Sequence, residues 1–139
     1  MNANITEFLG GLNFGAPATA GALADIETGL GVKLPRQYLA FMAQSDGAEG
    51  YTDEAYLFLW PSREVLALNG AAAEGGLVFF GTDGCGAAYA FDYARGAAVV
   101  AVPFNSPKPG RGALCAKSFY EFLIRRSGSR HCLQQTASR

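Results

Sequence analysis

The sequence lacks the residue patterns that mark most metal and redox sites. It has one histidine, His131, and three widely spaced cysteines, Cys85, Cys115 and Cys132, with no C-x-x-C pair. A structural zinc site takes four nitrogen or sulfur ligands, so we expect no metal and no cofactor. The odd, scattered cysteines also predict reduced thiols in a cytoplasmic protein rather than a disulfide framework.

Long hydrophobic runs are missing as well. No apolar stretch approaches the ~20 residues that a membrane-spanning helix needs, which predicts no contact with a membrane. The opening segment, MNANITEFLGGLNF, has no positive charge ahead of a continuous apolar run, so we do not interpret it as a signal peptide. Both absences agree with the cytoplasmic location that the cysteines suggest.

The apolar material that is present suffices for one core. Half of the 139 residues are hydrophobic and 12% are aromatic, which argues against global disorder and predicts a single domain. We expect this domain to span residues 1–127. Residues 128–139 have little to bury and are expected to form a flexible C-terminal tail.

The net charge of −1 hides an asymmetry along the chain. Residues 1–94 carry eleven acidic against three basic residues, a net of −8, whereas residues 95–139 carry eight basic against one acidic residue, a net of +7. Because electrostatic fields add by position, the two parts favour different partners. The basic residues are spread over strand, loop, helix and tail without an RNA or DNA motif, which disfavours nucleic-acid binding.

Hydrophobic periodicity predicts three principal helices, near residues 18–29, 35–45 and 118–127. Pro35 suits the first turn of the second helix, where a missing N–H costs nothing, and Gly47 suits a C-terminal stop. The third helix opens with a capping-box pattern, from Ser118 to Glu121. We interpret the apolar residues on these helices as core positions rather than as a ligand-binding set.

Alternating apolar residues predict four strands, near residues 55–60, 77–81, 87–92 and 98–103. The connections between the last three are too short for parallel crossovers, so the strands form antiparallel hairpins. Three further elements connect or end these strands. They are an acidic loop, DGAEGYTDE, before the first strand; a short helix with Ser62 as its N-cap after it; and the loop NSPKPGRG, which ends the sheet.

The glycine-rich stretch FFGTDGCGAAYAFDY admits several interpretations. It lacks the Lys-Ser or Lys-Thr of a P-loop, and a strand follows it where a dinucleotide site needs a helix. One carboxylate, Asp83, cannot supply the ligands of a calcium loop. Cys85 as a nucleophile needs a base, and His131 in the tail is the one histidine. A hairpin turn, with Asp83 and Gly84 as turn residues, fits best.

Acidic residues cluster in the segment before the first predicted strand. Asp46, Glu49, Asp53 and Glu54 fall within nine positions that contain no basic residue. Acid–base catalysis needs a pocket that separates two pKa values, which an exposed glycine-rich loop rarely provides. The remaining interpretations are a solvated loop and an acidic surface presented to a basic protein. We expect no catalytic residues.

Four segments, taken in order, match the pattern of one family. They are LGVKLP (residues 30–35) with Tyr38, Phe41 and Asp46-Gly47; LFLW (57–60) with Ser62, Glu64 and Asn69; FFGTDGCG (79–86) with Tyr89, Phe91 and Asp92; and Ser118-Phe119 through Phe122-Leu123. Together they cover roughly residues 22–124 and resemble the SMI1/KNR4 family, also called the SUKH superfamily. Asp46 departs from the family's asparagine, so a carboxylate replaces an amide there.

The resemblance implies an α+β fold with a central antiparallel sheet and helices packed beside it. Bacterial members are mostly immunity proteins that neutralise polymorphic or contact-dependent toxins, often nucleases, and fungal members are regulatory interaction hubs. We therefore expect a non-enzymatic immunity protein that binds a cognate toxin, with a regulatory interaction module as the alternative. The residues expected to meet a basic toxin are Asp46, Glu49, Asp53, Glu54 and Asp83. The toxin's identity and the oligomeric state stay open.

Overall fold

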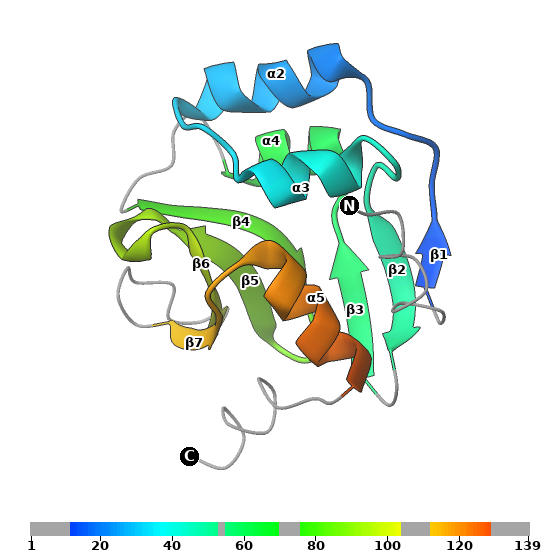
Figure 1. Cartoon of the computed structure of the whole chain (residues 1–139), viewed down its shortest axis with the longest axis vertical. Coiled ribbons are helices and arrows are strands. Elements are labelled where there is room, and N and C mark those ends of the chain that lie inside the picture. The colour runs from blue at the N-terminus through cyan, green and yellow to red at the C-terminus, as the bar shows by residue number, and fades with distance from the viewer. Residues whose placement is uncertain (1–11, 53–54, 70–75, 104–111, 129–139) are drawn as a thin grey trace.

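The computed structural model describes residues 12–52, 55–69, 76–103 and 112–128. Its seven strands form one sheet in chain order, each antiparallel to the next (Figure 1). The strands are β1 (Leu12–Phe14), β2 (Ala48–Thr52), β3 (Ala55–Leu59), β4 (Leu77–Thr82), β5 (Ala87–Asp92), β6 (Ala98–Pro103) and β7 (Ala113–Ala116). The predicted fold class, α+β with an antiparallel sheet, is confirmed.

Four helices in the described part of the chain pack beside the sheet (Figure 1). They are α2 (Ala20–Leu30), α3 (Arg36–Met42), α4 (Ser62–Asn69) and α5 (Phe119–Gly128). A single 3₁₀ turn, η2 (Tyr93–Arg95), joins β5 to β6. The helices predicted at 18–29, 35–45 and 118–127 are therefore present. The second is shorter than expected, because Gln44 and Ser45 both donate to the Phe41 carbonyl and tighten its last turn.

An aromatic cluster joins the helices to the sheet. The ring of Tyr38 on α3 lies 5.2 Å from the rings of both Phe91 on β5 and Phe119 on α5. The ring of Phe80 on β4 stacks on Phe91 at 4.4 Å. All four side chains are at most 1% exposed. Rings at these distances gain directional attraction beyond the area they bury, so this cluster sets how α3 and α5 sit on the sheet.

Three strands lie where the sequence predicts none. β2 occupies the segment predicted to be an acidic loop, β1 precedes the first predicted helix, and β7 continues the sheet beyond NSPKPGRG. The loop prediction is wrong for residues 48–52, and the predicted end of the sheet is wrong as well. Glu49 and Gly50 weaken strand propensity, but five residues of β2 pair with β3 and supply the backbone hydrogen bonds that stabilise the strand.

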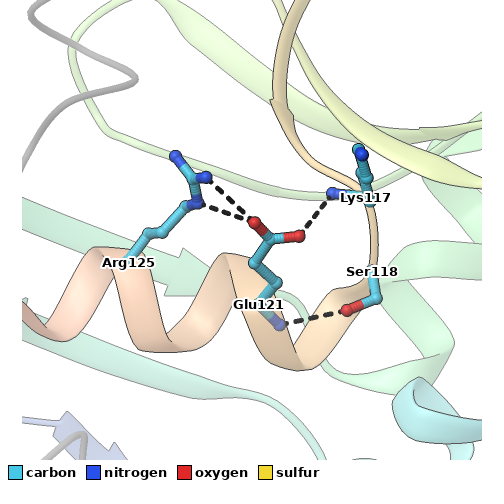
Figure 2. A network of polar contacts seen from close by, with 4 residues as sticks. All are labelled: Lys117, Ser118, Glu121 and Arg125. Carbon is cyan, nitrogen blue, oxygen red and sulfur yellow. Dashed lines mark hydrogen bonds and ion pairs between the residues drawn. The ribbon is translucent and has the colours of Figure 1, made fainter.

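The start of α5 keeps the predicted capping pattern with one change (Figure 2). The Ser118 hydroxyl accepts a hydrogen bond from the Glu121 N–H at 3.2 Å, as a capping box requires. The Glu121 carboxylate instead accepts from the N–H of Lys117, one residue before the expected donor, at 2.9 Å. That bond and the Arg125 guanidinium hold the pKa of Glu121 below its ordinary value. Local polar contacts thus cap the N-terminus of α5.

Different side chains cover the two faces of the sheet. Leu57 and Leu59 on β3 point into the main core with the helices. On the opposite face a small apolar cluster of Leu77, Ala90, Val100 and Val102 contains no helical residue. Side chains alternate along a strand, so Tyr56 and Phe58 on β3 also lie on this opposite face.

Candidate partner-binding surface

Asp46 lies between α3 and β2, and its carboxylate caps the N-terminus of α4. Its Oδ1 accepts from the backbone N–H of Ser62 at 2.7 Å, and its Oδ2 accepts from the Ser62 hydroxyl at 3.2 Å. A carboxylate at a helix N-terminus satisfies an orphan donor and meets the positive end of the helix dipole. The sequence predicts Ser62 as the N-cap itself, but Ser62 is the first helical residue and Asp46 supplies the capping group.

Asp83 organises the glycine-rich hairpin turn. It is 1% exposed, and its Oδ1 accepts from the N–H groups of Cys85 at 2.7 Å and Ala87 at 3.1 Å. Its Oδ2 is buried without a hydrogen-bond partner in the part of the chain that the structure describes. Gly84 and Gly86 adopt φ of 72° and 108°, which favour glycine. The turn prediction is confirmed, and Asp83 is buried in the turn instead of being exposed to a partner.

Among the acids of this set that the structure describes, Glu49 is the exposed one. It lies on β2, opposite Phe58 of β3, and its carboxylate accepts a hydrogen bond from the Tyr56 hydroxyl. This bond and, to a smaller extent, partial burial raise the pKa of Tyr56 to about 12. The Tyr56 ring also meets Tyr51 edge to face at 5.5 Å, and Tyr51 is 64% exposed. Glu49 therefore borders an exposed tyrosine pair.

Asp46 and Glu49 both line a surface hollow of about 230 Å³. It lies where β1 ends, β2 begins and β3 ends. We call it the β1–β3 hollow, and the lining residues used below are Asn13, Phe14, Asp46, Glu49, Phe58 and Pro61. Of the five acids predicted to meet a partner, the structure brings these two together. Asp53 and Glu54 lie outside the described residues.

Gly47 allows the chain to pass close behind this hollow. Its φ is 89°, and a Cβ placed there would lie 2.7 Å from the Leu59 carbonyl oxygen and 2.9 Å from the Pro61 nitrogen. Contacts that short are repulsive, so only glycine lets β2 begin against the end of β3. The sequence alone predicts Gly47 as a helix stop. The structure shows that it also sets the spacing of the hollow's walls.

Three aromatic residues of this region are not among the site residues that the sequence predicts. Tyr51, Tyr56 and Phe58 face away from the helices on paired positions of β2 and β3. Tyr56 and Phe58 belong to the segment AYLFLW, whose alternation predicts a strand that is apolar on both faces, and Tyr51 lies outside that segment. Only the pairing with β2 shows that Glu49 and Tyr51 share that face.

Metal and thiol chemistry receive no support from the described residues. Within them, no group of three or more His, Cys, Asp or Glu side chains is close enough together to hold a metal ion. Cys85 is exposed in the hairpin turn and Cys115 is buried. The residue considered as a base for Cys85, His131, lies outside the described residues.

A comparison with sequence models of known families assigns the chain to one of them. The sequence model of the SMI1 / KNR4 family (SUKH-1) matches residues 17–125, which include every described helix except the end of α5. The chain belongs to the SMI1/KNR4 family. Membership of the SMI1/KNR4 family is typically associated with immunity to polymorphic toxins, and its immunity proteins are generally non-catalytic.

Two further searches accompany the SMI1/KNR4 assignment. A search of curated proteins finds no match to this chain. In the described segments, no helix has both the length and the apolar character needed to cross a bilayer. The SMI1/KNR4 match includes Asp46, Glu49 and Phe58 but begins after Phe14, so part of the β1–β3 hollow lies outside the matched segment.

Proposed function

We propose that this protein is a non-enzymatic bacterial immunity protein that binds and neutralises a cognate polymorphic or contact-dependent toxin in the cytoplasm. The observation that carries the proposal is the family match over residues 17–125. Fold alone does not select a function, so the charge distribution supplies the second argument. It favours a toxin with a basic surface, such as a nuclease.

The charge argument starts from the substrate of a nuclease. An enzyme that binds nucleic acid attracts phosphates with Lys and Arg, so its inhibitor gains association rate and specificity by presenting carboxylates. Residues 1–94 carry a net charge of −8. The proposed acidic surface comprises Asp46, Glu49, Asp53, Glu54 and Asp83. Glu49 is the exposed contact residue among the three that the structure describes, and Asp46 and Asp83 contribute field from positions fixed by backbone donors.

Co-expression with a toxin tests the function directly. The product of each open reading frame adjacent to this gene, as the candidate toxin, is expressed in cells with and without the protein, and survival is measured together with co-purification. We expect survival and a stable complex only when both chains are present. A toxin domain that kills equally in both strains, with no complex, contradicts the proposal. A complex with an endogenous protein instead would identify a regulatory interaction module.

Charge reversal tests the acidic surface within that complex. Glu49→Lys should slow association with the toxin domain and flatten the dependence of its rate on salt, because carboxylates at an interface rim act mainly through steering. Asp25→Lys is the matched control, since Asp25 is an exposed acid on α2, away from the β1–β3 hollow. Equal association rates and salt slopes for both variants would place the contact surface elsewhere.

A further inference from the structure

The β1–β3 hollow combines negative charge with apolar walls. Asp46 and Glu49 supply the carboxylates, and Phe58, which is paired with Glu49 across β2 and β3, supplies aromatic surface. The adjoining Tyr51 is 64% exposed. This region therefore presents aromatic surface and charge to solvent together.

Both carboxylates keep unused capacity to accept hydrogen bonds. An ionised carboxylate accepts about four hydrogen bonds. Within the described residues, Asp46 accepts from Ser62 through both of its oxygens, and Glu49 accepts from Tyr56. The ion pairs present in the described part of the chain involve Asp92 and Glu121, not these two acids. A cation entering the hollow would meet two carboxylates that no described basic side chain neutralises.

The volume of the hollow limits the size of the group that it can bind. At about 230 Å³ it is smaller than the roughly 300–1,000 Å³ of sites for drug-sized ligands, so it suits a single side chain. Arginine fits both components of the lining. Its apolar stem packs against rings, and its planar guanidinium both stacks on aromatic faces and forms directional hydrogen bonds with carboxylates.

We propose that the β1–β3 hollow receives an arginine side chain of a basic protein partner, with Glu49 as its ion-pair acceptor. Asp46 adds negative field from the back of the hollow, and Phe58 contacts the stem. Tyr51 and Tyr56 flank the entrance as rigid aromatic contacts, the residue type that dominates binding energy at protein interfaces. The identity of the partner as a toxin rests on the proposed function, but the arginine site itself does not.

A short peptide tests the hollow without any toxin. The isotope-labelled protein is titrated with acetyl-Gly-Arg-Gly-amide, followed by NMR, and the same peptide with citrulline in place of arginine is the control. Citrulline keeps the shape of the side chain but carries no charge. Binding of one side chain is weak, with Kd on the order of millimolar. We expect amide shifts at Asn13, Glu49 and Phe58 for the arginine peptide alone, and their loss in Glu49→Gln but not in Asp25→Asn. Shifts located elsewhere, or equal for both peptides, overturn the inference.

The toxin complex gives the second readout. Glu49→Gln and Tyr51→Ala should each weaken binding of the toxin domain about tenfold or more, and Asp25→Asn should leave it unchanged. Unchanged affinity in all three variants overturns the arginine site while the immunity function stands. Peptide binding at the hollow without any toxin complex has the opposite meaning: the site stands and the immunity function falls.

Discussion

The carboxylate of Asp46 caps a helix that begins sixteen residues later, at Ser62. Oδ1 lies 2.7 Å from the Ser62 nitrogen and Oδ2 lies 3.2 Å from its hydroxyl oxygen. Pro61 immediately precedes the helix, and its carbonyl accepts the first helical hydrogen bonds, from Glu64 and Val65. Asp46 thus joins the end of α3 to the beginning of α4, and this structural duty is separable from any role in binding.

Removing the Asp46 side chain should destabilise the fold through this cap. We expect Asp46→Ala to lower the free energy of unfolding by about 1–2 kcal/mol, the upper part of the range for lost N-caps. Asp46→Asn retains an oxygen that can accept from the Ser62 N–H, so it should cost less than half as much. Urea denaturation monitored by circular dichroism gives both values. Equal losses for the two variants would show that charge, not the hydrogen bond, stabilises α4.

Two glycines with positive φ should respond differently to alanine. Gly31 has φ of 71°, and a Cβ added there would meet no neighbouring atom within 4 Å, so Gly31→Ala introduces only conformational strain of about 1 kcal/mol. At Gly47 a Cβ would also collide with the backbone of Leu59 and Pro61, so Gly47→Ala should cost about 2–4 kcal/mol. The comparison uses denaturation midpoints under identical conditions. Indistinguishable midpoints would mean that the strand ends move apart freely.

The closing helix should contribute strongly to stability through Phe122. This side chain is fully buried, with its ring 4.8 Å from that of Tyr89 and 5.8 Å from that of Phe80. We expect Phe122→Ala to cost about 3–5 kcal/mol. Ile124→Ala on the same helix removes a side chain that is 49% exposed and should cost about 1 kcal/mol or less. A thermal melt unmoved by Phe122→Ala would contradict the packing of α5.

Tyr56 should titrate late because of Glu49. With the pKa of Tyr56 at about 12, the folded state holds the phenol proton more tightly than the unfolded state, whose pKa is near 10. Its stabilising effect is therefore complete below about pH 10 and lost as pH rises through 12. Glu49→Ala should move the pKa of Tyr56 down towards 10. NMR titration of the tyrosine Cζ resonance measures this, and an unchanged pKa in the variant would exclude the hydrogen bond as its cause.

Cys85 should have no chemical duty. Its thiol is exposed in a turn whose geometry comes from Asp83, which accepts from the Cys85 N–H rather than contacting its sulfur. Cys85→Ser should leave the melting temperature and toxin protection at wild-type values, because the backbone contacts remain. Lost protection in a variant that melts normally would assign the thiol a functional role.

The sequence by itself determined the elements whose signals are local. The three-strand hairpin series from β4 to β6 follows from alternation and from turn residues such as Asp83 and Gly84. The helices follow from apolar spacing and caps, as the Ser118 hydroxyl shows at the start of α5. These features depend on residues within a few positions of one another, so one sequence window contains the whole physical cause.

Only the tertiary structure decided the strands at both sides of the sheet and the separate roles of the acids. β2 carries Glu49 and Gly50, and its pairing with β3 overrides their weak strand propensity. Asp46, Glu49 and Asp83 look alike in sequence, yet the first caps a helix, the second is exposed on a strand and the third is buried in a turn. Those roles depend on which donors the folded chain brings to each carboxylate. For Asp46 that donor is sixteen residues away, beyond the reach of any local pattern.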